Sequence, residues 1–371
     1  MKIMTVFGTR PEAIKLAPVI HELSRQNIDQ SVCVTGQHRQ MLDQMLNFFD
    51  IHPDVDLDLM KSNQSLADIG LGILGGFGEH LKKIRPTGII VPGDTSTTFF
   101  AALSAFYEKI PVYHVEAGLR TDNMYDPFPE EINRRLVTQL ATLNFAPTER
   151  AVSNLIKSGV KDEQVFLTGN TVVDALLWAE KKVDNPINTA LQGINQNSKT
   201  ILLTTHRREN LDTGMDNIFK SVVRLVENNP DIQIVFPVHL NPLVAQKAKS
   251  YFDHIGDNRV ILTEPLSYPD LILVMKNAYL VMTDSGGIQE EAPALGKPVV
   301  VLRNTTERPE GVEAGTAVLA GTNEKEIYDI TNKLINDKVA YEKMANAVNP
   351  YGSGNSAEQI VGYIVDDQSN K

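Results

Sequence analysis

Short apolar runs alternate with longer amphipathic segments along the whole chain. This alternation is the pattern of βαβ units, in which helices cover both faces of a mostly parallel sheet. One set of strands is predicted at residues 3–7, 31–34, 88–91, 111–114, 143–146 and 165–167. The pattern then begins again and predicts strands at residues 201–205, 234–238, 260–262, 280–282 and 299–302. The chain is therefore expected to be an α/β protein with two Rossmann-like, doubly wound halves.

The length of 371 residues exceeds the size at which single hydrophobic cores usually stop growing. The polar stretch 184–199 is expected to connect the two halves. Helical periodicity returns at 356–365 after a run of glycine and proline, which allows the chain to turn back. We expect an N-terminal domain of residues 1–170 with a C-terminal helix of residues 355–371, and a second domain of residues 171–354.

The charge balance and the single cysteine limit the possible partners and compartment. The chain has 35 basic and 46 acidic residues, and a net charge of -11 argues against general binding to nucleic acid or anionic membranes. Cys33 lies in an apolar run and has no partner for an intramolecular disulfide, so a buried strand thiol in a reducing compartment is expected. We find neither a signal-peptide core nor the roughly 18 apolar residues of a membrane span, and expect a cytoplasmic protein.

Single carboxylates follow two predicted strands, and another carboxylate begins the helix after them. Asp94 and Glu116 each follow an apolar run, and Glu130 begins the helix after them. Parallel sheets build active sites at the carboxyl ends of their strands, where neighbouring carboxylates can divide acid and base roles. Helix N-capping is the alternative role for Asp94. Glu131 is expected either to be solvated or to pair with Arg135.

The first strand ends in a turn with the features of an anion site. Gly8 permits a tight turn, and Pro11 suits the start of a helix. Free amides at that helix N-terminus would bind an anion, and Arg10 and Lys15 would strengthen the site. The spacing G-x-G-x-x-G is absent, so a tightly bound nicotinamide cofactor is not expected.

A second anion site is predicted after the strand at 280–282. Gly286 and Gly287 let the backbone approach a diphosphate, and Ser285 can donate its hydroxyl at the helix N-terminus. Glu291, one turn into that helix, is placed for a ribose diol. Arg308 is expected to add a cation beside it. The sequence therefore favours a nucleoside diphosphate as the occupant.

Two histidines follow predicted strands of the second half. His206 lies beside Arg207 and Arg208, where it is well placed to face a phosphate. His239 also follows a strand, and it is expected either to face a ligand or to have a structural role. A zinc site is not expected, because there is one cysteine and no H-E-x-x-H or C-x-x-C spacing.

A series of motifs occurs in order over nearly the whole chain: G-T-R-P-E at 8–12, G-D-T at 93–95, H-V-E-A-G-L-R at 114–120, P-F-P-E-E at 127–131, T-G-N-T at 168–171, H-R-R-E-N at 206–210, D-S-G-G at 284–287 and E-R-P-E at 307–310. Together they closely resemble the non-hydrolysing bacterial UDP-N-acetylglucosamine 2-epimerases. The resemblance implies a GT-B architecture with two Rossmann-like domains, UDP in the interdomain cleft, a C-terminal helix that returns to the first domain, and a homodimer.

The resemblance also implies reversible conversion of UDP-N-acetylglucosamine to UDP-N-acetylmannosamine without NAD or metal. The hydrogen at C2 of the sugar is not acidic, so UDP would leave first by anti elimination to 2-acetamidoglucal and re-add in a syn step. Acid and base roles fall on Asp94, Glu116 and Glu130 without an assignment of which abstracts the proton, and His206 would orient or protonate the diphosphate. The residues assigned to UDP are Arg10, Lys15, Arg134, Ser285, Gly286, Gly287, Glu291 and Arg308.

Several members of that family bind a second UDP-N-acetylglucosamine as an activator. The matching residues here are Gln37, His38, Gln40, Arg207 and His239. This chain has Asn63 where related sequences often carry arginine, and Leu240 where they read H-R-N-P. The loss of arginine removes a bidentate phosphate partner, so the sequence supports activation less than catalysis.

Three other functions remain open from the sequence. A hydrolysing relative would release free N-acetylmannosamine, and a GT-B glycosyltransferase would share the UDP site but need an acceptor. A UDP-sugar sensor would bind without turnover. The product of the epimerase would supply cell-surface polysaccharide or teichoic acid synthesis, and the sequence does not select among these pathways.

Overall fold

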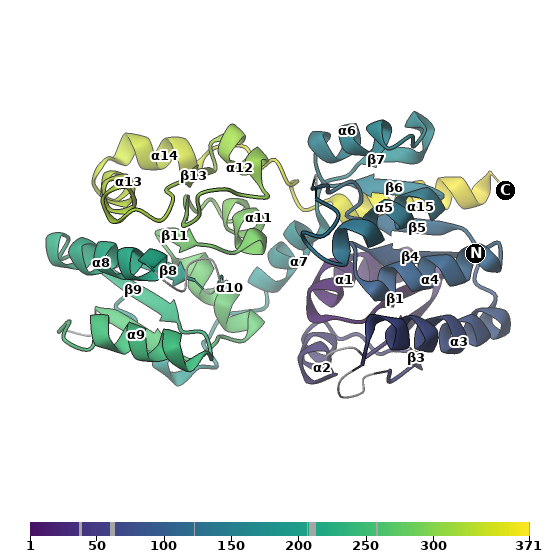
Figure 1. The fold of residues 1–371 in the computed structure, drawn as a ribbon, viewed down its shortest axis with the longest axis horizontal. Helices are drawn as coiled ribbons and strands as arrows, with labels where there is room; N and C mark the ends of the chain where they lie inside the picture. The colour runs from purple at the N-terminus through teal and green to yellow at the C-terminus, as the bar shows by residue number, and fades with distance from the viewer. Residues whose placement is uncertain are drawn as a thin grey trace. The chain divides into compact units, whose positions relative to one another are not determined.

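The computed structural model describes residues 1–36, 39–59, 64–121, 123–205, 207, 213–256 and 259–370. The chain forms two compact units: unit 1 holds residues 1–175 and 351–371, and unit 2 holds residues 176–350 (Figure 1). The chain passes from unit 1 to unit 2 within α7 (Thr171–Glu180). The polar stretch 184–199, expected as the connection, instead belongs to unit 2, where Leu191 is buried and a short 3-10 helix packs against a strand.

Unit 1 is built on a seven-stranded parallel sheet of order β3-β2-β1-β4-β5-β6-β7. Its strands are β1 (Lys2–Phe7), β2 (Asp29–Val34), β3 (Val55–Asp56), β4 (Gly88–Pro92), β5 (Val112–Val115), β6 (Leu143–Ala146) and β7 (Val165–Leu167). Its helices are α1 (Arg10–Arg25), α2 (Arg39–Phe48), α3 (Leu66–Ile84), α4 (Ser96–Tyr107), α5 (Glu130–Leu140), α6 (Glu149–Lys157), η1 (Asp162–Gln164), the start of α7, and α15 (Ser356–Ser369). The strand order reverses between β1 and β4, which makes their carboxyl ends the topological switch point.

Unit 2 repeats this plan with a six-stranded parallel sheet of order β10-β9-β8-β11-β12-β13. Its strands are β8 (Lys199–Thr204), β9 (Ile232–Pro237), β10 (Val260–Thr263), β11 (Leu280–Thr283), β12 (Val299–Val301) and β13 (Ala317–Leu319). Its helices are η2 (Thr189–Gly193), α8 (Thr213–Asn228), α9 (Pro242–Phe252), α10 (Tyr268–Asn277), α11 (Gly286–Ala294), α12 (Pro309–Ala314), α13 (Glu324–Asn336) and α14 (Lys338–Ala345). Here the switch point lies between β8 and β11.

The predicted α/β class is confirmed, and each strand expected from the sequence is present. All four residues of β11 are buried, as expected for a strand with helices on both faces. In unit 2 one apolar cluster contains Phe219 and Phe236, and another contains Val274 and Val299. The short strands β3 and β13 were not predicted from the sequence.

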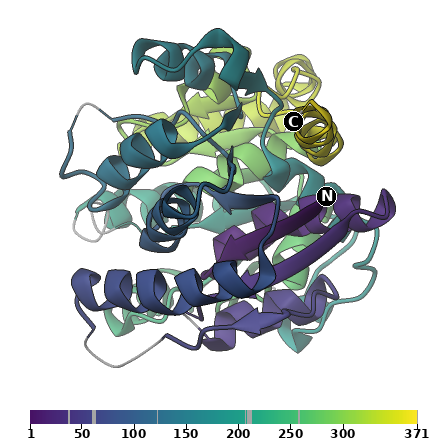
Figure 2. The same cartoon turned by 90° about the vertical axis from the view of Figure 1, so that its right-hand side faces the viewer.

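The C-terminal helix α15 belongs to unit 1, where it packs against α1 (Figures 1 and 2). The buried Tyr113 on β5 donates its hydroxyl to Asp367 at 2.6 Å and accepts from the Gln368 side chain at 2.7 Å. Gln368 also donates to the Thr87 carbonyl oxygen at 3.0 Å. These bonds attach the last turn of α15 to β5 and to the loop before β4.

Tyr113→Phe is expected to lower the free energy of unfolding of unit 1 by about 1–2 kcal/mol, because Asp367 and Gln368 lose a buried partner. Urea unfolding followed by circular dichroism measures the change. Tyr363→Phe is the matched control, since the Tyr363 ring packs on Phe166 and the described chain gives its hydroxyl no hydrogen bond. Equal stability of the two variants would contradict the role given to Tyr113.

His114 on β5 is fully buried and joins β5 to the turn after β4. Its Nε2 donates to the Gly93 carbonyl oxygen at 2.7 Å. Burial lowers the pKa of His114 to about 4 from its ordinary 6.5. Between these two values the unfolded chain binds a proton at this position and the folded chain does not, so stability is lost as the pH falls through that window.

The free energy of unfolding of unit 1 is therefore expected to fall by about 2 kcal/mol from pH 7 to pH 5 because of His114 alone. His114→Gln retains a donor for Gly93 but has no proton to gain, so its stability should vary less with pH by that amount. Urea unfolding of both proteins at the two pH values tests this, and identical pH dependence would contradict it.

Candidate active site

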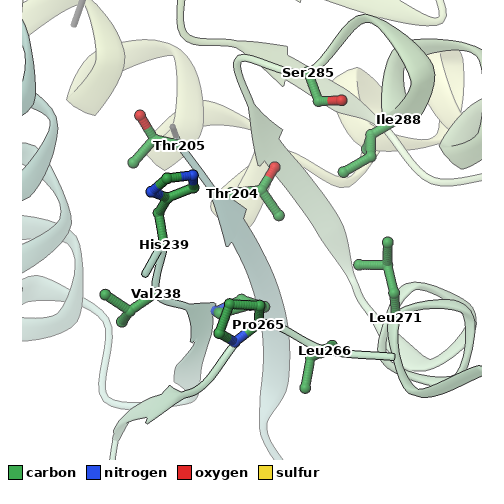
Figure 3. Close-up of a pocket in the computed structure, with 10 residues that line it drawn as sticks. Thr204, Thr205, Val238, His239, Pro265, Leu266, Leu271, Ser285 and Ile288 are labelled. Carbon is green, nitrogen blue, oxygen red and sulfur yellow. The ribbon is translucent and has the colours of Figure 1, made fainter. Parts of the chain in front are cut away.

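A pocket of about 180 Å³ lies at the switch point of unit 2. Thr204 and Thr205 from the end of β8 line one side, with His239 beside them, and Ile288 and Leu271 line the other (Figure 3). The remaining lining residues are Pro237, Val238, Pro265, Leu266 and Ser285. Mostly apolar walls with a few polar groups suit a flat heterocycle such as a nucleobase. These apolar walls could not be predicted from the sequence, because their residues come from the ends of β9 and β10, from α10 and from α11, with no common motif.

The turn after β11 presents open backbone at the start of α11. Ser285 is the N-cap, and its side chain makes no capping bond. A Cβ built on Gly286 would meet nothing within 4 Å, so this backbone can be approached closely. Helix N-terminal amides and their partial positive charge attract anions. The geometry is therefore compatible with the predicted diphosphate position, which stays a prediction.

Asp284 connects the two central strand ends of unit 2. It is fully buried, and its Oδ2 accepts from the Thr205 hydroxyl and from the Arg207 amide, each at 2.9 Å. The Arg207 side chain lies 3.9 Å from Glu307, which is also 3.6 Å from Arg303. Asp284 thus holds Thr205 and Arg207 after the end of β8. His206, predicted to face the phosphate, lies outside the described residues.

Two predicted nucleotide ligands, Arg308 and Glu291, lie near the start of α11 or contact a residue of that helix. Arg308 pairs through Nε with Glu290, a side chain of α11 that is nearly fully buried. Its charge is therefore already compensated, whereas the sequence analysis treated it as an available cation. Glu291 is also buried in α11. Its Oε2 lies 3.9 Å from the position that a Cβ on Gly287 would take. Glu290 escaped the sequence analysis, because nothing in its spacing marked it as a partner of Arg308.

In unit 1 each predicted catalytic carboxylate at a strand end has its own cation. Lys15 of α1 donates to Glu116 Oε2, and Arg134 of α5 donates to Asp94 Oδ2. Thr95, not Asp94, caps α4, since its hydroxyl accepts from the Thr98 amide at 3.2 Å. The alternative N-cap role for Asp94 is therefore wrong. Lys15 and Arg134, predicted to bind UDP, lie against the carboxylates.

The surroundings of Asp94 and Glu116 suit proton transfer. Burial raises the pKa of the Asp94 carboxyl, the Arg134 charge opposes that rise, and the Glu116 charge adds to it. A raised pKa brings a carboxyl closer to the range in which it can both take and return a proton. Glu116 is buried and has a φ of 59°, a left-handed conformation that costs free energy in a residue other than glycine. Strain of this kind is concentrated at functional sites.

The helix N-terminus of α1, predicted to bind an anionic ligand, is occupied by a side chain of the same helix. The Gly8 and Thr9 amides donate to the Glu12 carboxylate at 2.9 and 2.8 Å, and the Thr95 hydroxyl donates to its other oxygen at 2.6 Å. Glu12 is buried, and desolvation raises its pKa. The chain's own carboxylate thus fills the position that the sequence analysis left for a ligand. Arg10 is the first residue of α1 and is partly exposed.

Two adjacent glutamates at the start of α5 have different environments. Glu130, a predicted catalytic residue, is half-buried, and the described chain gives it no hydrogen bond. Glu131 is fully buried and accepts from Arg135 Nε at 2.6 Å and from the Thr121 amide at 2.9 Å. Arg134 Nη1 also lies 3.4 Å from Oε2 of Glu131. Pairing with Arg135 is as expected, but the expected alternative of a solvated Glu131 is wrong.

The residues expected to bind an activator are only partly described. Gln37 and His38 lie outside the described residues, and Gln40 is exposed on α2. His239 Nδ1 accepts from the Asn241 amide at 3.1 Å, and the ring lines the pocket of unit 2. His239 therefore lines the pocket of unit 2, and Gln40 belongs to unit 1.

None of the helices in the described part of the chain combines the length and the apolar character that a membrane span needs. Within the same residues, no three side chains of histidine, cysteine, aspartate or glutamate group as metal ligands.

Comparison with known proteins places the chain among enzymes that act at C2 of a nucleotide sugar. The family model described as UDP-N-acetylglucosamine 2-epimerase matches residues 21–365. The UDP-N-acetylglucosamine 2-epimerase of Bacillus subtilis is 52% identical over 363 residues, which cover 97% of this chain and 94% of that protein.

Solved structures agree over the full length and support the predicted GT-B fold class. UDP-GlcNAc 2-epimerase from Neisseria meningitidis, bound to UDP-GlcNAc, is 48% identical with a TM-score of 0.87, covering 99% of this chain and 100% of that chain. The Methanocaldococcus jannaschii enzyme in complex with UDP-GlcNAc and UDP is 35% identical with a TM-score of 0.78, covering 99% and 100%. The chain belongs to the UDP-N-acetylglucosamine 2-epimerase family.

Proposed function

We propose that this protein interconverts UDP-N-acetylglucosamine and UDP-N-acetylmannosamine without hydrolysing them. The observation that carries the proposal is the pair of carboxylates at neighbouring strand ends, the partly buried Asp94 with Arg134 and the buried Glu116 with Lys15. With two acid–base groups, one can remove the proton from one face of C2 and the other can return a proton to the opposite face. Similarity to enzymes bound to UDP-GlcNAc supports the substrate.

Unit 2 supplies the nucleotide site in this proposal. The uracil ring would occupy the mostly apolar pocket beside Thr205 and His239, and the diphosphate would lie on the open backbone of Ser285 and Gly286. Helix N-terminal amides stabilise the negative charge that develops on UDP as it leaves. Glu291 would accept hydrogen bonds from the ribose diol.

Unit 1 supplies the proton chemistry. The C1–O bond breaks with its electron pair going to the diphosphate oxygen, and a carboxylate takes the proton from C2, so that 2-acetamidoglucal forms. A second carboxyl group then protonates C2 on the opposite face, and the diphosphate oxygen re-adds to C1. Asp94, Glu116 and Glu130 are the candidates for these two roles, and His206 for orienting or protonating the diphosphate. No redox step is involved, because the substrate and product have the same oxidation state.

Proton NMR of UDP-N-acetylglucosamine incubated with the protein in deuterium oxide tests this reaction. A mixture of both epimers with deuterium at C2 is the expected result. Accumulation of free N-acetylmannosamine would show the hydrolysing activity instead. An unchanged sugar would contradict both the epimerase and the hydrolysing activity. Acceptor-dependent release of UDP would then identify a glycosyltransferase.

Asp94→Asn and Glu116→Gln are each expected to lower kcat by about 100-fold or more while UDP affinity stays within a few fold, because a group needed for proton transfer is lost. We expect the same of His206→Ala. Coupled assays give kcat, and calorimetric titration gives the UDP affinity. Glu163→Gln, an exposed carboxylate beside Lys161, is the control. Near-normal rates in all of the active-site variants would contradict the mechanism.

Gly286→Ala is expected to weaken UDP binding at least about 10-fold without loss of stability. The free protein has room for the added methyl group, but a diphosphate on this backbone would contact it. Calorimetric titration with UDP measures the affinity. Gly193→Ala is the matched control, because its Cβ would also meet nothing within 4 Å. Unchanged affinity in Gly286→Ala would place the diphosphate elsewhere.

We also propose a homodimer and a second, activating UDP-N-acetylglucosamine. Leu71 on α3 and Phe106 and Tyr107 on α4 are more than half exposed, and the two helices pack together, which supports a shared apolar face for a second copy. Sedimentation at the single-chain mass would contradict the dimer.

For the activating site we propose Gln37, His38, Gln40, Arg207 and His239. Strictly hyperbolic dependence of the rate on substrate concentration would contradict activation. The product is proposed to enter cell-surface polysaccharide or teichoic acid synthesis, and normal surface polymers in a deletion strain would contradict that role.

A further inference from the structure

The T-G-N-T motif at 168–171 has no role in the proposed mechanism, yet one of its side chains contacts a proposed catalytic residue. Asn170 is 3% exposed, and its Nδ2 donates to Glu116 Oε1 at 3.1 Å. Its other side-chain atom, Oδ1, accepts from the Val172 amide at 3.2 Å and caps α7. The two ends of one amide therefore serve different groups.

The backbone around Asn170 is fixed from the C-terminal side of unit 1. The Asn170 amide donates to the Tyr351 carbonyl oxygen at 2.7 Å. Gly169 and Gly352 have φ angles of 81° and 116°, and a Cβ on Gly169 would lie 3.1 Å from Gly352 Cα. Only glycine allows these two segments to approach so closely. The Asn170 side chain is thus held in place where the chain leaves unit 1 and where it returns.

The hydrogen bond from Asn170 reaches a residue whose backbone is strained and whose surroundings are charged. The titratable groups that face it are Lys15 from α1, Asp94 after β4 and His114 on β5. Lys15 bonds to Oε2, while the neutral amide of Asn170 bonds to Oε1. A donor to a carboxylate favours the ionised form and fixes the plane of the carboxyl group.

We propose that Asn170 is a positioning residue for catalysis: its side-chain amide orients the Glu116 carboxylate and sets the pH at which that carboxylate takes up a proton. This inference rests on the proposed function, in which Glu116 is one of the acid–base groups.

Asn170→Asp separates this role from the capping of α7. Aspartate caps a helix as well as asparagine does, so the bond to the Val172 amide remains. The donor to Glu116 is lost, and a second negative charge takes its place. Asn323→Asp is the matched control, because Asn323 caps α13 in unit 2 through the Lys325 and Glu326 amides.

The pH profile of kcat and carbon NMR of the Glu116 carboxyl group are the measurements. In Asn170→Asp we expect kcat to fall by about 10-fold or more at neutral pH and the limb controlled by Glu116 to move up by about one pH unit. Asn323→Asp should retain the wild-type profile. An unchanged profile in Asn170→Asp, or a fall in kcat explained by a lower unfolding temperature alone, would overturn the proposal.

Carbon NMR keeps the two proposals distinguishable. Protein labelled at the glutamate carboxyl carbon, with Glu116→Gln for assignment, reports the pKa of Glu116 without any substrate. A rise in Asn170→Asp supports the inference even if the epimerase reaction is not found, and no rise refutes it even if the reaction is.

Discussion

Partial burial of Asp94 and full burial of Glu116, at the carboxyl ends of two neighbouring strands, is the constraint on which the site of unit 1 depends. An isolated buried carboxylate is expensive, and a cation with additional donors must compensate it. Asp94 has Arg134, and Glu116 has Lys15 and Asn170. These partners come from different elements, α5, α1 and the start of α7. The sheet and its surrounding helices must therefore be folded before either carboxylate can be buried.

The two units use the same strand order for different purposes. In unit 2 the switch point between β8 and β11 leaves an apolar pocket and an open helix N-terminus at Gly286. In unit 1 the amides of Gly8 and Thr9, in the turn after β1, donate to Glu12. At the switch point of unit 2 the helix N-terminus after β11 is therefore open, whereas at that of unit 1 the helix N-terminus after β1 is filled by the chain's own carboxylate.

The return of the chain to unit 1 contributes to the site as well as to the fold. The helix α15 is attached through Tyr113, Asp367 and Gln368 to the central part of the sheet. Just before it, Tyr351 accepts from the amide of Asn170, whose side chain reaches Glu116. The segment in which the chain returns to unit 1 therefore supports a carboxylate near the first third of the sequence.

The sequence by itself determined the class of fold, most strand positions and the residue types at the strand ends, because hydrophobic periodicity and turn residues are local properties. Asp94, Glu116 and the Ser285 turn were all found in this way. Only the tertiary structure decided which charges pair. Lys15 and Arg134 were assigned to a nucleotide but contact carboxylates, Arg308 contacts Glu290, and Glu131 is buried. Each of these contacts joins side chains whose distance is set by how helices pack on the sheet, which no local pattern records.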